Sequence, residues 1–134
     1  MNKSHLIAMS ISAAFATLIG CNLGTGSASI SNAQVTQGNC GALNKTAPTC
    51  TVTLSYNTGG ESSITFGVIA TPAQPTGQFN PAFGSCVLTS GPQTCPVVVT
   101  YARPPNGPVP QTLVFTLGTG ESAAKSTGIQ FVGQ

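Results

Sequence analysis

The chain has 134 residues, of which only 4% are charged, with four Lys and Arg residues against two Glu, one His and no Asp. This length suits a single domain with one modest hydrophobic core. The few, scattered cations exclude a nucleic-acid-binding surface and a polybasic membrane patch, because both need clustered Lys or Arg.

The N-terminal segment has the pattern of a removable export signal. A positive residue, Lys3, precedes an apolar run over residues 6–19 that is too short to span a bilayer. The run ends in Leu18-Ile19-Gly20-Cys21, which resembles the lipobox of bacterial lipoproteins. That resemblance implies that residues 1–20 are removed as a signal peptide and that the Cys21 thiol is diacylated. The alternative is a plain secretory signal with a chance cysteine at the cleavage site.

The same resemblance implies a location in the bacterial cell envelope. Lipid on Cys21, with acyl chains such as palmitate, implies a membrane anchor, since each buried methylene contributes about 0.8 kcal/mol. Asn22 at the next position is similar to outer-membrane lipoproteins under enteric-type sorting. We expect residues 21–29, rich in small side chains, to form a flexible lipidated tether, and residues 30–134 to form the folded domain.

Four cysteines are left once Cys21 is assigned to lipid. An even number in an exported protein predicts two disulfides, for which three pairings are formally possible. A zinc site is the competing interpretation, but its cysteines come in pairs two to four residues apart, whereas nine and eight residues separate these. We predict sequential bonds, the second closing a hairpin about the Ser90-Gly91 turn. The predicted disulfides are Cys40–Cys50 and Cys86–Cys95.

The remaining sequence predicts an all-β domain. Short runs of Val, Thr, Ile, Phe and Tyr alternate with Gly, Pro and Asn, and no window has a sustained 3.6-residue apolar period. Hydroxyl residues alternate strictly with larger apolar or aromatic residues over positions 51–56, which puts Val52, Leu54 and Tyr56 on one face of a strand. Residues 97–99 are all valine, which predicts a central strand or a covered outer face. We predict a single immunoglobulin-like antiparallel sandwich, with strands over residues 29–36, 51–56, 62–70, 85–89, 97–101, 112–117 and 128–132.

Two segments of the domain are similar to each other. Residues 40–56 and 86–101 each hold a cysteine pair and then a tyrosine, at an offset of about 45 residues. We expect two half-sandwiches that share one core, with chance similarity as the alternative. The run over residues 95–101, with Gly107 and residues 113–115, is similar to the end of bacterial immunoglobulin-like repeats of the Hydin type. This resemblance implies the fold rather than a function, and the Arg103-Pro104-Pro105 turn departs from the pattern.

Few side chains suit catalysis. The only histidine, His5, lies in the signal segment, and no aspartate is present, so neither a Ser-His-Asp arrangement nor a histidine zinc site can form in the mature chain. Glu61 and Glu121 are a formal glycosidase pair, but both follow glycine-rich turns and no tryptophan is present to stack a sugar. We therefore predict no enzymatic activity, no cofactor and no metal site.

The connection over residues 71–84 is the predicted contact site. It is long, has no predicted secondary structure, and carries Phe79 and Phe83, and aromatic side chains on loops are typical anchors for a protein partner. The alternative is that both phenylalanines plug one end of the sandwich. A second connection, over residues 102–111, is stiffened by four prolines.

These features predict a non-catalytic binding or assembly module of the cell surface or periplasm. Its predicted partners are the membrane, through lipid on Cys21, and an envelope protein, with no nucleic acid. A self-assembling surface or filament protein is the alternative, because a low-charge β domain can pair edge to edge. A small carbohydrate-active enzyme is a third, less favoured possibility.

Overall fold

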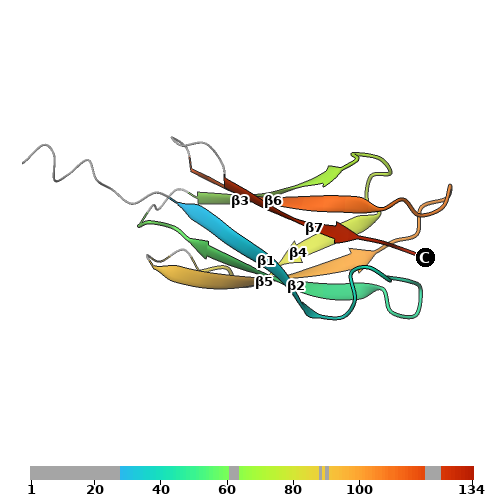
Figure 1. The fold of residues 1–134 in the computed structure, drawn as a ribbon, viewed down its shortest axis with the longest axis horizontal. Helices are drawn as coiled ribbons and strands as arrows, with labels where there is room; N and C mark the ends of the chain where they lie inside the picture. Colours follow the sequence, from blue (N-terminus) through green and yellow to red (C-terminus); the bar gives the residue numbers. More distant parts are fainter. Residues whose placement is uncertain (1–27, 61–63, 88, 90, 120–124) are drawn as a thin grey trace, which may run out of the picture.

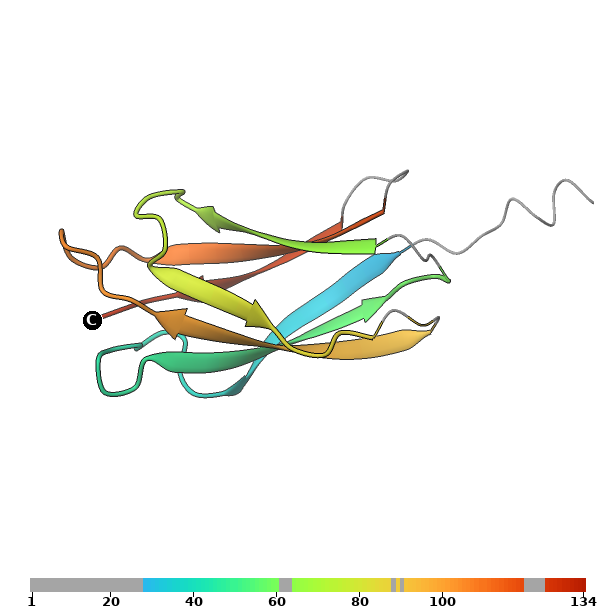
Figure 2. The same ribbon diagram turned by 180° about the vertical axis from the view of Figure 1, so that it is seen from behind.

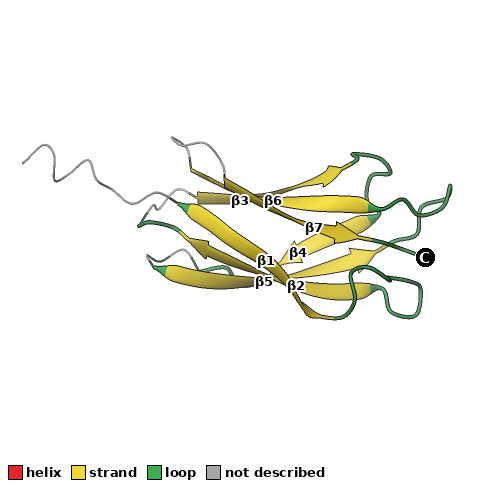
Figure 3. Cartoon of the chain, viewed as in Figure 1, coloured by secondary structure: helices red, strands yellow, loops and turns green. Residues whose placement is uncertain are grey.

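The computed structural model describes residues 28–60, 64–87, 89, 91–119 and 125–134. Within these residues the chain forms strands and loops, and Figure 3 shows no helix among them. The lipobox, Cys21, Ser90, Glu61 and Glu121 lie outside the described residues.

Seven antiparallel strands form two facing sheets (Figure 1). One sheet has the order β1-β2-β5-β4 and the other has the order β3-β6-β7. This is the arrangement of the immunoglobulin constant fold, in which strands A, B, E and D face C, F and G, so the predicted sandwich is confirmed. The strands are β1 (Ser29–Gln37), β2 (Thr49–Asn57), β3 (Ile64–Thr71), β4 (Phe79–Phe83), β5 (Pro92–Tyr101), β6 (Gln111–Thr119) and β7 (Lys125–Phe131).

The core lies between the sheets and is built by alternation along β2, β5 and β6. Side chains at every second position of these strands are buried, and each large one contributes about 1.5 to 3 kcal/mol. Strand β5 pairs with β2 and β4 and is therefore central, while Val98 on its outer face is 41% exposed. The central position, rather than a covered outer face, accounts for the valine run. The buried positions include Val52, Leu54, Tyr56, Val97, Val99, Leu113, Phe115 and Leu117.

The fourth strand is not where the sequence predicts it. The prediction of a strand over residues 85–89 and a loop over residues 71–84 is wrong, because β4 forms from Phe79 to Phe83 and pairs with the second half of β5. That position lets the side chain of Phe79 enter the core. A proline at position 81 is compatible with the strand because β4 is at the sheet edge.

Both predicted disulfides are present. The Cα atoms are 5.5 Å apart in Cys40–Cys50 and 4.7 Å apart in Cys86–Cys95. Each bond closes a loop of about ten residues, which is worth roughly 2 to 3 kcal/mol through the entropy of the unfolded chain. The predicted hairpin around the second bond is wrong, however, because Cys86 lies in a loop and the bond ties that loop to β5.

The two cysteine-containing segments occupy equivalent places in one sandwich. In each, the first cysteine comes three residues after an edge strand and the second is buried in the next strand. Strands β2 and β5 pair so that Cys50 is opposite Val99 and Cys95 is opposite Leu54. An approximate two-fold axis between β2 and β5 therefore relates β1 and β2 to β4 and β5 within one sheet. The two segments share one core rather than forming two domains.

The sandwich has two distinct ends (Figures 1 and 2). We call the end where β1 begins the proximal end, because the predicted tether precedes it. The opposite, distal end carries the loops over residues 38–48, 72–78 and 102–110. Leu43 of the first loop is buried, and its N–H donates to the Val132 carbonyl at 2.9 Å, which closes the distal end. A Cβ atom at Gly133 would overlap the Tyr101 ring, so this closure requires glycine there.

Candidate functional site

Two buried glutamines hold the distal loops together. Gln78, just before β4, and Gln111, the first residue of β6, are each 1% exposed. The Gln78 amide nitrogen donates to the Gln111 side-chain oxygen at 3.2 Å and to the Val109 carbonyl at 2.6 Å. In return, the Val109 N–H donates to the Gln78 side-chain oxygen at 2.9 Å. The loop over residues 102–110 is thereby fixed to the start of β4.

Gln111 extends this network to the loop over residues 72–78. Its amide nitrogen donates to the carbonyl oxygens of Pro72, at 2.8 Å, and Pro75, at 3.2 Å. Proline has no N–H, so this loop has few donors for ordinary turns, and the glutamine amide supplies the missing ones. Among the described residues, every buried side-chain nitrogen and oxygen has a hydrogen-bond partner. The two proline-containing loops therefore form one unit with a satisfied polar interior.

A recess of about 300 Å³ opens between these two loops. Pro75 forms one wall, while Pro104, Pro105 and the exposed Val109 contribute from the other loop. Asn106 adds an amide with both donor and acceptor groups. Apolar walls with a polar amide are typical of sites that take an apolar side chain and orient it by a hydrogen bond.

A second recess, of about 260 Å³, combines two cations with an aromatic wall. Lys45 from one distal loop and Arg103 from another line it beside Tyr101. Pro48 and Gln134, the last residue of the sequence, complete the lining. The residues that the structure describes contain no Asp or Glu side chain. The distal end therefore combines an apolar recess and one with two cationic side chains, both lined by the loop over residues 102–110.

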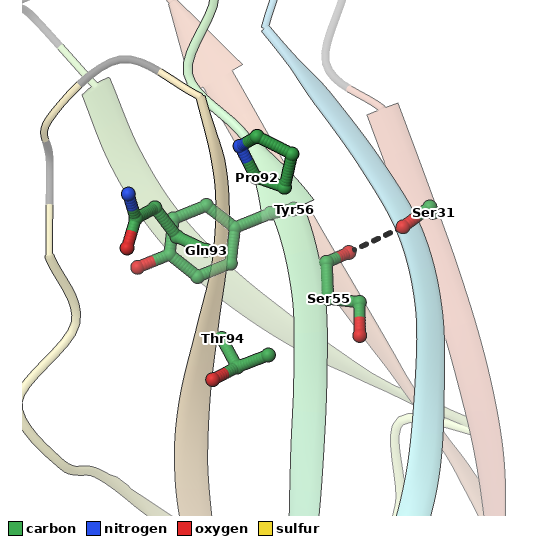
Figure 4. A pocket seen from close by; sticks show the side chains of 6 residues that line it. All are labelled: Ser31, Ser55, Tyr56, Pro92, Gln93 and Thr94. Carbon is green, nitrogen blue, oxygen red and sulfur yellow. Dashed lines mark hydrogen bonds between the residues drawn. The ribbon is translucent and has the colours of Figure 1, made fainter.

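A third hollow, of about 290 Å³, lies near the proximal end on the outer side of β1, β2 and β5 (Figure 4). Ser31 is the extra residue of a β-bulge in β1, and its hydroxyl donates to the Ser55 carbonyl at 2.9 Å. Gln93 and Thr94 contribute an amide and a hydroxyl. These groups suit hydrogen bonding to a neutral ligand, and none of them acts as a base near neutral pH.

Tyr56 is the one titratable residue that lines this hollow. Its ring is buried, and its hydroxyl donates to the Val87 carbonyl at 2.7 Å. Burial raises the pKa of the Tyr56 phenol above its ordinary value of 10.0. The phenol therefore stays protonated at neutral pH and ties the loop after β4 to the core.

The structure separates the two predicted contact residues. Phe79 is 5% exposed, and its ring centroid is 5.5 Å from that of Phe131. Its prediction as an exposed loop anchor is wrong, because it begins β4 and faces the core. Phe83, at the other end of β4, is 36% exposed, and its ring centroid is 5.8 Å from that of Phe66. A partner contact through Phe83 stays a prediction.

Neither Gln78 nor Gln111 is among the residues predicted from the sequence. Gln111 has a usable signal, since it precedes Leu113 and Phe115 at the two-residue spacing of an inward face. Gln78 has no comparable signal, because the strand that follows it was not predicted. Its partners are also distant in sequence, Gln111 being 33 residues away.

Within the described residues, no three His, Cys, Asp or Glu side chains lie together as a metal site requires. No helix in the described part is long and apolar enough to cross a membrane. Neither a protein-family model, nor a curated protein, nor a solved structure matches the chain.

The different burial of the two phenylalanines predicts different costs of truncation. Phe79→Ala should lower the free energy of unfolding by about 3 to 5 kcal/mol, because it leaves a cavity among aromatic rings. Phe83→Ala should cost less than half as much, since its side chain is partly in water. Chemical denaturation of both variants measures this, and equal losses would contradict the assignment of Phe79 to the core.

The buried amide network predicts that Gln78→Ala destabilises the distal loops. It removes the partner of the buried Gln111 side-chain oxygen, at a cost of about 1 to 3 kcal/mol for a buried group left unsatisfied. It also removes both hydrogen bonds that hold the Val109 N–H and carbonyl. Amide hydrogen exchange over residues 102–110 should accelerate, and the melting temperature should fall. Gln130→Ala, which truncates an exposed glutamine on β7, is the matched control and should change stability by less than about 0.5 kcal/mol. An unchanged rate of amide hydrogen exchange at Val109 in Gln78→Ala would show that Gln78 does not hold this loop in place.

Proposed function

We propose that the protein is a lipid-anchored lipoprotein of the bacterial envelope that acts as a non-catalytic binding or assembly module. The observation that carries this proposal is the Leu18-Ile19-Gly20-Cys21 motif at the end of an apolar run. The two disulfides support it, because stable disulfides are typical of exported proteins. Acyl chains on Cys21 provide the membrane attachment, and the sandwich provides the rigid body of the module.

The distal loops are the proposed binding surface. A tether that precedes Ser29 enters at the proximal end, so these loops lie at the opposite end of the sandwich. Gln78 and Gln111 fix two of them before any partner arrives, which lowers the entropy cost of binding. Loops held by a rigid sandwich are a common place for recognition.

The chemistry of this end favours a protein partner with apolar and acidic side chains. The recess beside Pro104 and Pro105 suits an apolar side chain, and the one beside Lys45 and Arg103 suits a carboxylate. We propose that one envelope protein supplies both the apolar side chain and the carboxylate.

A non-catalytic role is supported by the composition of the mature chain. It has no histidine or aspartate, and its only carboxylate side chains are Glu61 and Glu121. General acid-base catalysis near neutral pH most often uses histidine or a pair of carboxylates with tuned pKa values. The second candidate function is self-assembly, which the uncharged sheet edge at β3 favours.

The anchor proposal predicts that the mature protein begins with an acylated cysteine at position 21. Expressed in a bacterium from the full sequence, the protein should fractionate with membranes, and mass spectrometry should find two or three acyl chains on its N-terminal peptide. Cys21→Ala should abolish acylation and processing at this site. An unmodified cysteine at the mature N-terminus, or a wild-type protein in the soluble fraction, would refute the anchor.

The binding proposal predicts a charge effect confined to the distal end. Arg103→Glu should reduce the recovery of the envelope partner several-fold, because reversing a charge at an interface introduces repulsion with an acidic partner. Lys125→Glu is the matched control, since Lys125 begins β7 at the proximal end. The measurement is chemical cross-linking in intact cells, followed by purification of the lipoprotein and quantitative mass spectrometry. Equal losses in both variants would contradict binding through the distal loops.

A further inference from the structure

Four strands lie at sheet edges, and three of them carry features that hinder pairing with another chain. Strand β1 has two register shifts and packs against β7, β4 is short and has Pro81 at its centre, and β7 begins with Lys125. Sheet edges are usually protected from pairing with another chain by β-bulges, prolines, charged side chains or another segment that packs over them. Strand β3 has no charge, no proline and no register shift along its pairing with β6.

The outer side of β3 is also apolar and open. Ile69, on its outer face, is 62% exposed, the highest value among the large hydrophobic side chains described. Figure 2 shows β3 along the rim of the sandwich, with β6 on its paired side. Phe66 of β3 and the partly exposed Phe83 of β4 lie near each other on this side of the molecule. The free edge of β3 therefore has backbone N–H and C=O groups without a partner strand, and exposed apolar side chains lie beside it.

We infer that a second copy of this chain pairs with this edge, β3 against β3, in antiparallel order about a two-fold axis at Val68. In an antiparallel ladder, two residues that lie directly opposite each other point their N–H and C=O groups either both toward the partner strand or both away from it. Pairing about Val68 meets this condition and joins seven of the eight residues of β3, from Thr65 to Thr71.

The side chains of β3 are self-complementary in this register. Phe66 lies opposite Ala70 of the second copy, so a large side chain meets a small one. Ile69 lies opposite Gly67 of the second copy, which repeats the large-to-small match on the outer face. Thr65 lies opposite Thr71 of the second copy, and threonine pairs across strands are favourable. Shifting the two-fold axis to Gly67 would place glycine opposite glycine and Phe66 opposite Val68, so the match would be lost.

Electrostatics does not oppose the pairing. Strand β3 carries no charged side chain, and the described cations Lys45, Arg103 and Lys125 all belong to other segments. Antiparallel order places the proximal end of one copy beside the distal end of the other. This order brings the loop over residues 72–78, which follows β3, close to the second copy, and the two predicted tethers leave from opposite ends of the dimer. The inference does not depend on lipidation, and its tests differ from those of the anchor.

The first test compares a charge placed on the edge with the same charge placed elsewhere. In sedimentation velocity of the intact protein in detergent micelles, the wild type should show a concentration-dependent dimer. Ile69→Lys should weaken dimerisation at least tenfold, because the two lysines face each other diagonally across the two-fold axis. Val98→Lys is the matched control, since it changes an exposed valine on a central strand. Circular dichroism melting confirms that both variants fold.

Two outcomes of this test overturn the inference. One is a wild-type protein that stays monomeric over the whole concentration range, in which case the occupant of the edge is not a second copy. The other is an Ile69→Lys variant that dimerises as strongly as the wild type, which means that the association uses another surface or arises from the micelle.

The second test addresses the register. Val68→Cys should give a covalent dimer under non-reducing conditions, because directly opposed residues in antiparallel strands have Cα atoms about 4.5 to 5.5 Å apart, within the range of a disulfide. Peptide mapping should show position 68 linked to itself and both native disulfides intact. Val98→Cys should stay monomeric on the same gel. A dimer in sedimentation without this covalent link would refute pairing about Val68.

Discussion

The pairing of β2 with β5 is the constraint on which the rest of the sandwich depends. These strands form nine consecutive residue pairs, from Thr49–Thr100 to Asn57–Pro92, without a register shift. Because side chains alternate in direction, this single register decides which residues of both strands face β6. A slip of one residue would expose Val52 and Leu54 and bury threonine and serine in their place. The buried faces of both central strands, including Cys50 and Cys95, follow from this pairing.

The approximate two-fold axis of this central pair relates two halves of the four-stranded sheet that are similar but not identical. Each half contains an edge strand, a cysteine-containing loop and a central strand. The edge strands differ in length, since β1 has nine residues and β4 has five. After Phe83 the chain leaves the sheet, and the loop that follows is held by Cys86–Cys95 and by the hydrogen bond from Tyr56 to Val87. The disulfide thus stabilises a region where strand pairing has ended.

The sequence was sufficient to predict the parts of the fold that depend on local patterns. Alternation of Val52, Leu54 and Tyr56 with hydroxyl residues predicts the buried face of β2, and it is correct. The cysteine pairs were correctly predicted because both loops are short. Cys86 and Cys95 nevertheless do not face each other across a hairpin, because Cys86 lies in the loop after β4 and Cys95 lies in β5.

The features that escaped prediction depend on contacts between distant segments. Strand β4 contains Asn80 and Pro81, which disfavour a strand locally, and it forms because β5 offers an edge and the core accepts Phe79. The hydrogen bonds of Gln78 and Gln111 join residues that are separated by 31 to 39 positions in the sequence. A glutamine is ordinarily a surface residue, and only the proline carbonyl oxygens brought to it by the fold make its burial favourable. A single sequence carries little information about such a convergence.

The scarcity of charge links the proposed anchor to the proposed pairing. Edge strands of soluble proteins commonly carry lysine, which prevents association in free solution. This chain lacks that protection at β3, and only three described residues are cations. An anchor in a membrane would confine all copies to a thin layer and raise their effective concentration. Because the predicted tethers leave from opposite ends of the antiparallel pair, both copies reach one membrane only when their strands lie along its surface. Under that confinement, association at β3 depends on how many copies the membrane carries.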